Sequence, residues 1–137
     1  MHTTKRFFAP LETNPAETRA TVAPTTVTKL CALGLEVLIQ AGAGTQSDYS
    51  DAEYEKAGAT IVPDADTGYA QADIVARVSK PSSEDLNKIK PGTLHISFLD
   101  PFNETALIDD LAKRDISAIS MEMIPRSTLA QKMGALS

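Results

Sequence analysis

Residues 34–44 read Gly-Leu-Glu-Val-Leu-Ile-Gln-Ala-Gly-Ala-Gly, a buried-type strand set between two glycine signals. Gly34 is typical of a residue that ends a helix, and residues 36–40 join apolar and β-branched side chains as a buried strand does. A capping box at Ser50 and Glu53 then predicts the start of a second helix. The order helix, strand, helix indicates βαβ units.

The same alternation of apolar runs and amphipathic segments continues on both sides of this stretch. The predicted strands are residues 6–9, 36–40, 60–62, 74–78, 93–99 and 116–121, and the predicted helices are residues 24–34, 50–58, 67–71, 82–89 and 104–113. Parallel strands joined by helices need right-handed crossovers and cover on both faces. We therefore expect an α/β fold: an open, mostly parallel sheet flanked by helices, of flavodoxin-like or Rossmann-like type.

Composition limits the number of domains and the class of partner. The chain has 137 residues, of which 42% are hydrophobic, enough for one domain with a core but not for two full domains. The formal net charge is -5, and Lys and Arg are scattered among Asp and Glu, so we expect no nucleic-acid partner. No run approaches the roughly 18 apolar residues of a membrane span, and the first ten residues lack the apolar core of a secretory signal.

The single cysteine, Cys31, has no partner for an internal disulfide. It stands at an apolar helical position, so we expect it to be a small buried hydrophobe, compatible with a reducing cytoplasm.

Ligands bind such sheets at the carboxyl ends of the strands, so the loops there are candidate sites. Arg19 in the first loop could clamp a carboxylate or phosphate, although an isolated arginine is more often solvated and this one could pair with Glu17. Residues 42–44, Gly-Ala-Gly, resemble the start of a dinucleotide fingerprint, but Ser47 stands where the third glycine is needed. We expect a loop with unusual backbone angles there.

Two further loops follow later strands. Residues 100–103 read Asp-Pro-Phe-Asn, which predicts a turn whose Asn103 caps the next helix and which carries no chemistry. After the last strand, Arg126 and Gln131 could reach one ligand, as a cation for phosphate or ribose and as an amide that donates and accepts.

The alternatives for this last loop are structural, and the residues alone leave them open. Thr128 with Gln131 fits a capping box, and Arg126 could pair with Glu122. The spacing of Leu129, Met133 and Leu136 favours the core side of a helix over cofactor contacts.

Three stretches carry a resemblance to a known family. They are residues 17–24 (Glu-Thr-Arg-Ala-Thr-Val-Ala-Pro), residues 34–44 and residues 50–54 (Ser-Asp-Ala-Glu-Tyr). Together they resemble the N-terminal domain shared by alanine dehydrogenase and proton-translocating nicotinamide nucleotide transhydrogenase. The resemblance covers nearly the whole chain.

Within that family, residues 123–133 (Met-Ile-Pro-Arg-Ser-Thr-Leu-Ala-Gln-Lys-Met) look like the transhydrogenase alpha subunit. The corresponding loop of that subunit carries an Arg, a Gln and an Asp near the nicotinamide of bound NAD(H). The resemblance therefore implies that Arg126, Ser127, Thr128 and Gln131 bind the cofactor.

Three positions depart from the family pattern. Gly134 stands where the transhydrogenase motif has its Asp. Ser79 and Asp100 stand where alanine dehydrogenases have a substrate-positioning lysine and a catalytic histidine. Without those two groups the reduction and amination of pyruvate lack their chemistry, so the resemblance favours the transhydrogenase.

The resemblance also implies a function for the whole protein. A transhydrogenase exchanges hydride between NAD(H) on this component and NADP(H) on a partner component, coupled to proton translocation through a membrane component. Hydride exchange needs no proton-transfer side chain, so we expect no catalytic residue and no metal site in this domain. The family further implies a homodimer and a cytoplasmic location, peripheral to the inner membrane through partner subunits.

The sequence stops at Ser137, shortly after an amphipathic segment has begun. This predicts a domain of residues 1–137 that is truncated before the NAD-binding Rossmann lobe. We expect such a fragment to fold, to bind NAD(H) weakly and to show no transhydrogenation. The alternatives are an alanine dehydrogenase-like oxidoreductase and a non-enzymatic flavodoxin-like module, which would need an acidic pair that residues 9–12 lack.

Overall fold

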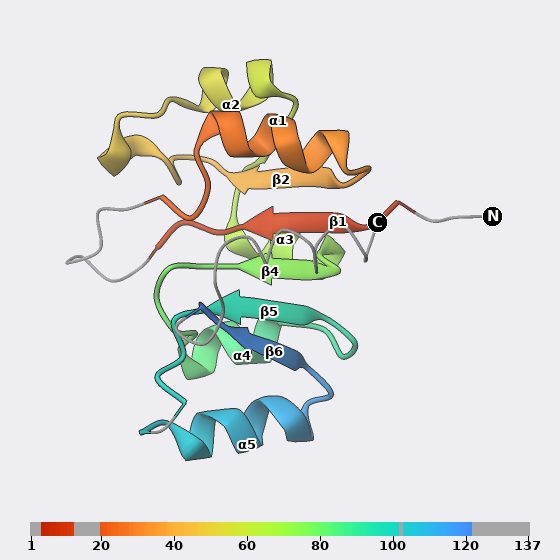
Figure 1. Cartoon of the computed structure of the whole chain (residues 1–137), viewed down its shortest axis with the longest axis vertical. Helices are drawn as coiled ribbons and strands as arrows, with labels where there is room; N and C mark the ends of the chain where they lie inside the picture. Colours follow the sequence, from red (N-terminus) through yellow and green to blue (C-terminus); the bar gives the residue numbers. More distant parts are fainter. Residues whose placement is uncertain (1–3, 13–19, 102, 122–137) are drawn as a thin grey trace.

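The computed structural model describes residues 4–12, 20–101 and 103–121. In this part of the chain six parallel strands form one sheet, in the order β3-β2-β1-β4-β5-β6 (Figure 1). The strands are β1 (Arg6–Ala9), β2 (Glu36–Gln40), β3 (Thr60–Val62), β4 (Ile74–Ala76), β5 (Leu94–Ser97) and β6 (Ser117–Ser120). The predicted α/β fold with an open parallel sheet is confirmed.

Helices cover both faces of this sheet. On one face lie α1 (Pro24–Ala32) and α2 (Asp51–Ala57), preceded by the short 3-10 turn η1 (Thr45–Ser47); on the other lie α3 (Ala65–Gln71), α4 (Ser83–Lys88) and α5 (Thr105–Lys113). The chain moves outward from β1 to β3 in one direction and then from β4 to β6 in the other. Since crossovers are right-handed, this reversal places the two sets of helices on opposite faces.

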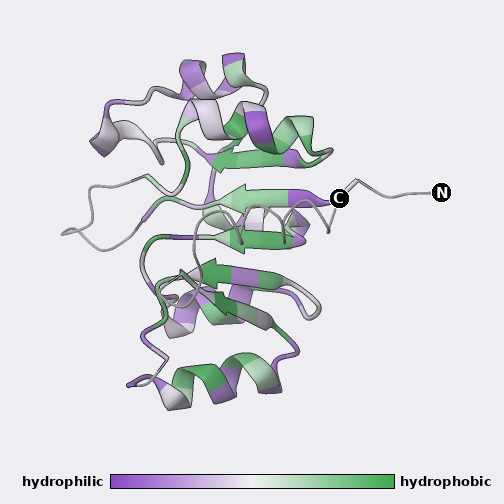
Figure 2. Ribbon diagram, viewed as in Figure 1, coloured by the Kyte–Doolittle hydropathy of each residue, from purple (hydrophilic) through white to green (hydrophobic). Residues whose placement is uncertain are grey.

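The core is divided by the sheet into two clusters. Phe7 and Phe8 are both 0% exposed, but they point to opposite faces of β1 because successive strand residues alternate. Phe7 belongs with Val27 and Leu30 of α1, whereas Phe8 packs edge-on against Tyr69 of α3. Figure 2 shows the hydrophobic colour concentrated along the strands, as expected for a parallel sheet buried on both faces.

Helix ends follow the predicted capping signals. Ser50 and Glu53 form a capping box at the start of α2, and Gly58 ends that helix with a φ of 117°. Ser82 and Asp85 form a second capping box at the start of α4. These signals act within four residues of the chain, which is why the sequence shows them.

Two predicted strands are shorter than expected. β4 ends at Ala76 instead of residue 78, and β5 covers Leu94–Ser97 instead of residues 93–99. The reason at β4 is a side chain from elsewhere: the Glu12 carboxylate accepts hydrogen bonds from the backbone N–H groups of Val78 and Ser79. The chain bends there and leaves the ladder.

Two local predictions were wrong. Asn103 does not cap α5, whose N-cap is Glu104 without a side-chain bond; its amide instead donates to the Asp100 carboxylate at 3.0 and 3.2 Å. Cys31 is partly exposed, because it lies on the side of α1 that faces the end of α2, with Sγ 3.8 Å from the Gly58 carbonyl oxygen.

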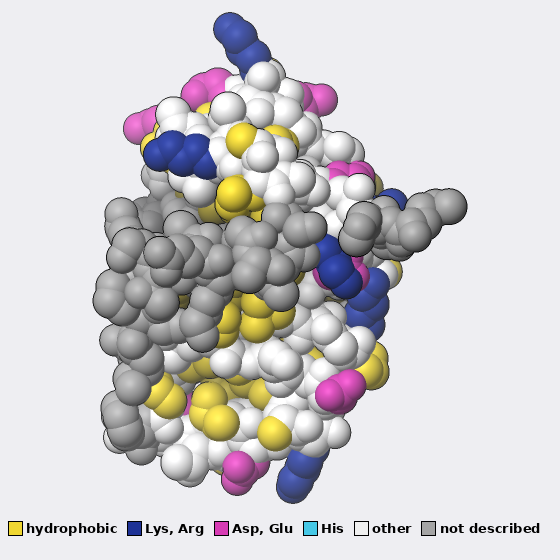
Figure 3. All heavy atoms as spheres, turned by 45° about the vertical axis from the view of Figure 1, so that its right-hand side comes forward, with side chains coloured by type: hydrophobic (Ala, Val, Ile, Leu, Met, Phe, Trp, Pro, Cys, Tyr) yellow, Lys and Arg dark blue, Asp and Glu magenta, His cyan; other side chains and the backbone are white. Residues whose placement is uncertain are grey.

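The surface turned toward the reader in Figure 3 is mixed in character. Hydrophobic side chains gather in its lower half, where β4 to β6 and α5 lie, while Lys, Arg, Asp and Glu are scattered around them. On this face the basic side chains do not form a stripe.

Candidate functional site

The sheet reverses its strand order between β1 and β4. In open α/β sheets, ligands bind outside the carboxyl ends of the strands at such a switch point, because the following loops part to opposite faces there. The residues just after β1 and β4 therefore decide what this edge can do. In this structure they are Glu12 on one side and residues 77–80 on the other.

Glu12 is the centre of this edge. Its side chain is only 7% exposed, and its Oε2 lies 3.0 Å from Nη2 of Arg77. Its Oε1 accepts hydrogen bonds from the backbone N–H of Val78 and, at 3.0 Å, from that of Ser79. One carboxylate thus joins the end of β1 to the loop after β4.

Arg77 continues the network toward the helices. Its side chain is 2% exposed, and its Nη1 forms an ion pair with Asp85 of α4 and lies 3.5 Å from the Tyr69 hydroxyl. Asp85 also accepts a bond from the N–H of Ser82 at 2.9 Å. Every polar partner that Arg77 needs for burial, apart from its Nε, comes from these groups.

The network fixes the charges of its members. Burial alone would raise the pKa of Asp85, but hydrogen bonds from Ser82 and the charge of Arg77 hold that pKa below its usual value. Burial raises the pKa of the Tyr69 hydroxyl. At neutral pH the cluster therefore holds one cation between two carboxylates, beside a protonated tyrosine.

Ser79 and Asp100 lie at the carboxyl ends of β4 and β5, as the sequence predicts for residues that follow strands. Ser79 is held through its backbone by Glu12, and Asp100 has a left-handed backbone with a φ of 52°. Between them, Lys80 forms an ion pair with Glu104 at the surface. This lysine is therefore paired at the start of α5 and is not presented to the switch point.

The glycine loop after β2 is closed on its own chain. Gly42 has a φ of +83°, which confirms the predicted unusual backbone, and its N–H donates to Asp51 at 2.9 Å. A Cβ added to Gly44 would lie 2.5 Å from the Tyr54 ring. The Ser47 hydroxyl accepts a bond from the N–H of Ala20 at 2.9 Å. Because the loop packs inward in this way, it does not form a pyrophosphate cradle.

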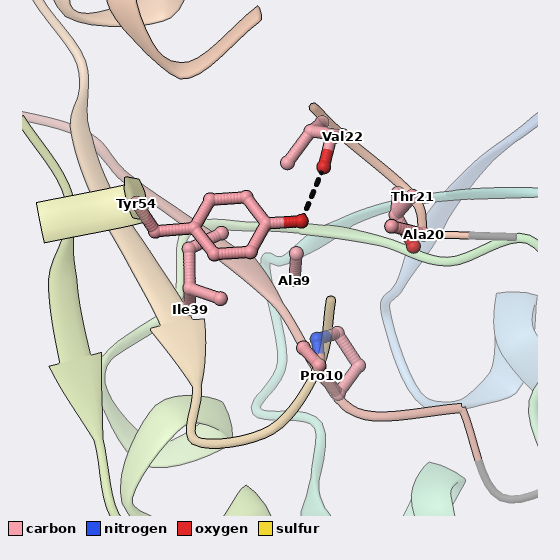
Figure 4. Close-up of a pocket in the computed structure, with 8 residues that line it drawn as sticks. Ala9, Pro10, Ala20, Thr21, Val22, Ile39 and Tyr54 are labelled. Atoms are coloured by element: carbon pink, nitrogen blue, oxygen red, sulfur yellow. Dashed lines mark hydrogen bonds between the residues drawn. The ribbon is translucent and has the colours of Figure 1, made fainter. Parts of the chain in front are cut away.

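Next to this loop is a cavity of about 10 Å³, lined by Pro10, Thr21 and Tyr54 among others (Figure 4). The Tyr54 hydroxyl donates to the Val22 carbonyl at 2.8 Å, and burial raises the pKa of Tyr54 to about 12. The Oγ1 of Thr21 has no hydrogen-bond partner among the described residues. Such a volume holds about one water molecule and no cofactor.

The loop residues that the family resemblance singles out lie outside the described residues. They are Arg126, Ser127, Thr128, Gln131 and Gly134, and the same holds for Glu17 and Arg19 of the first loop. Within residues 4–12, 20–101 and 103–121, no cluster of three or more His, Cys, Asp or Glu could hold a metal ion. No helix in these ranges is long and apolar enough to cross a membrane.

Sequence reasoning missed the network of Glu12, Arg77 and Asp85. Arg77 lies in a β-branched run that predicted only a strand, and Asp85 was interpreted only as a capping residue. A charged residue inside an otherwise buried strand was the available signal, since an arginine is rarely buried without a partner.

Comparison with known proteins adds the family. A family model described as alanine dehydrogenase/PNT, N-terminal domain, matches residues 8–137. The chain belongs to this family. The resemblance inferred from residues 17–24, 34–44 and 50–54 is thereby confirmed.

Both kinds of relative named by the family resemble this chain. It is 35% identical over 133 residues to the first of the separate polypeptides of the NAD(P) transhydrogenase alpha subunit of Rhodospirillum rubrum, covering 93% of this chain and 35% of that protein. It is 35% identical over 119 residues to alanine dehydrogenase of Mycobacterium tuberculosis, covering 87% and 32%. The chain thus spans about a third of the length of these two relatives.

Solved structures give the same pair. The transhydrogenase from Sinorhizobium meliloti has a TM-score of 0.83 and 33% identity, covering 96% of this chain and 39% of that one. An L-alanine dehydrogenase has a TM-score of 0.79 and 25% identity, covering 84% and 32%. The match confirms the Rossmann-like fold.

Proposed function

We propose that the chain serves as the N-terminal lobe of the NAD(H)-binding component of a proton-translocating NAD(P) transhydrogenase. The similarity to the Rhodospirillum rubrum and Sinorhizobium meliloti transhydrogenases supports this assignment. In the whole complex, hydride passes between NAD(H) on this component and NADP(H) on a partner component. A membrane component translocates the protons, so the chain reaches the membrane through its partners and forms a homodimer within the complex.

The observation that carries this proposal over alanine dehydrogenase is the chemistry at the ends of β4 and β5. Ser79 and Asp100 occupy the places of the family's lysine and histidine, and neither side chain can replace them. Of the histidines, only His95 falls within the described residues, and it is 0% exposed inside the core. This edge therefore presents no imidazole that could protonate a substrate among the described residues.

The described residues do not form a dinucleotide site by themselves. The loop at Gly42 is closed, and the cavity beside it holds about one water. We therefore propose that the nucleotide is held chiefly by a second, Rossmann-type lobe, as the greater length of the relatives allows. This chain contributes Arg126, Ser127, Thr128 and Gln131 at the nicotinamide. NAD(H) itself supplies or accepts the hydride, and the chain's task is to orient the ring and exclude water.

Two activities of the complete gene product test the function. Purified with its membrane and NADP-binding components, it is expected to transfer hydride from NADPH to an NAD⁺ analogue with a distinct absorbance. Alone, it is expected to show no oxidation of NADH that depends on pyruvate and ammonium. The reverse pattern, pyruvate-dependent oxidation without transhydrogenation, would establish the second candidate, an alanine dehydrogenase-like enzyme, which the 35% identity to the Mycobacterium tuberculosis protein favours.

The proposed cofactor loop has its own test. In the complete gene product, Arg126→Ala removes a charged hydrogen-bonding group from the nicotinamide side and is expected to weaken NADH binding about tenfold or more. Lys113→Ala, which removes a cation from the far end of α5, serves as the control and should leave affinity unchanged. Equal affinity of both variants, measured by titration calorimetry, would remove Arg126 from the site.

A further inference from the structure

Glu12 has bonds that a purely structural ion pair does not need. Its Oε2 pairs with Arg77, but its Oε1 is given to the N–H groups of two successive loop residues, Val78 and Ser79. These amides have left the β4 ladder, so the carboxylate sets the path of the loop where it emerges at the sheet edge. The partners are 65 to 67 residues apart in the chain.

Arg77 and Asp85 hold this carboxylate in place. The guanidinium of Arg77 binds Glu12 through Nη2 and Asp85 through Nη1, and all three side chains are at most 11% exposed. Asp85 is itself fixed by the Ser82 N–H in the first turn of α4. A buried ion pair contributes little net stability compared with apolar side chains of similar size, because both charges lose their hydration. What the arrangement does supply is fixed geometry at one place.

That place is the switch point between β1 and β4. Ligand-binding edges of this type depend on surrounding residues that hold their loops, since small displacements of a loop cost a large part of the activity. The segment after Glu12 leads to Arg19, and the loop after β4 carries Ser79 and Lys80. The carboxylate of Glu12 connects the two.

We propose that Glu12 is a positioning residue: it fixes the loop of residues 78–80 at the switch point so that this edge can receive the nicotinamide end of NAD(H). The inference rests on the proposed function. Glu12 acts through the backbone of Val78 and Ser79, with Arg77 holding its carboxylate in place.

The test compares three variants of the complete gene product assembled with its partner components. Glu12→Ala removes all three bonds, and Glu12→Gln keeps the shape but replaces one acceptor oxygen by a donor that faces donors. Glu36→Gln is the matched control, since Glu36 forms an ion pair with Arg6 at 3.0 Å but is 41% exposed and lies at the start of β2, at the opposite edge of the sheet.

The expected result is selective for one cofactor. Both Glu12 variants should raise the KM for NADH about tenfold, while the KM for NADP⁺ on the partner component stays within twofold and Glu36→Gln matches the wild type. A purely structural role would lower the melting temperature without separating the two KM values. Amide exchange should quicken at Val78 and Ser79 and remain slow at Val75 of β4.

Each other outcome decides against a stated part of the proposal. If the wild-type complex exchanges no hydride, the proposed function fails and this inference with it. If the wild type is active and the folded Glu12 variants keep both KM values, this inference alone is overturned. Should Glu12→Ala give no cooperative thermal transition, Glu12→Gln decides by the same criteria, and its own failure to fold would mark Glu12 as structural.

Discussion

At the scale of single residues, His95 is the group whose charge the fold excludes. Its Nε2 lies 3.0 Å from the Ser97 hydroxyl, and its Nδ1 has no hydrogen-bond partner among the described residues. Burial lowers its pKa to about 4, and the charge of Arg77 acts in the same direction, while Asp85 opposes them. The imidazole is therefore neutral at physiological pH, with its proton best placed on Nε2 facing Ser97, because an unpaired lone pair is tolerated better than an unpaired N–H.

This residue predicts a pH dependence of stability. Between about pH 6.5 and pH 4 the unfolded histidine binds a proton that the native one does not, so the stability is fully present above 6.5 and declines as the pH falls. The pKa difference corresponds to a loss on the order of 3 kcal/mol by pH 4. Urea unfolding at several pH values measures it.

His95→Gln is the control for that experiment, because glutamine can still bond to Ser97 but does not titrate. Its free energy of unfolding should change clearly less between pH 7 and pH 4 than that of the wild type. Identical pH dependence in the two proteins would mean that His95 is not the group responsible. A further loss below about pH 3.8 is expected in both, since the pKa of Asp85 is lowered in the native state.

At the scale of elements, the contact of α3 with β1 depends on a residue without a side chain. Gly68 lies in α3, and a Cβ added there would come within 2.1 Å of Cζ of Phe8, a ring that is 0% exposed. Any side chain at this position would push the helix away from the strand or force the aromatic ring from its place.

Gly68→Ala is therefore expected to destabilise the domain although alanine favours helices. The helical preference contributes about 1 kcal/mol in favour of alanine, whereas overpacking a tight core costs about 1 to 3 kcal/mol. Ala70→Gly, at an exposed position of the same helix, measures the preference alone. Thermal unfolding should show a lower midpoint for Gly68→Ala; a midpoint above that of the wild type would contradict the packing account.

Elements and their order could be predicted from the sequence, whereas their ends and the buried network could not. The caps at Ser50 and Ser82 act on neighbouring residues, so their letters are sufficient. The end of β4 depends on Glu12, more than sixty residues earlier, and Asn103 was taken from helix capping by the Asp100 carboxylate. The pairing of Glu12 with Arg77 exists only because β1 and β4 are neighbours in the sheet, which no local pattern contains.

At the scale of the whole molecule, the domain has a complete core on both faces of its sheet but no dinucleotide cradle among its described residues. The family fixes its place among proteins, and the replacement of lysine and histidine by Ser79 and Asp100 separates it from alanine dehydrogenase chemistry. In this account the chain supplies one side of a nicotinamide site, held in shape by Glu12, to a nucleotide that another lobe binds.

Titration calorimetry with NADH, on residues 1–137 and on the complete gene product side by side, tests this division of the site most directly. A core of this size lets residues 1–137 fold, and a two-state thermal transition would verify that before the titration. The account predicts micromolar binding by the complete gene product and much weaker binding by residues 1–137. Micromolar binding by residues 1–137 alone would contradict it, because the whole cofactor site would then lie within this domain.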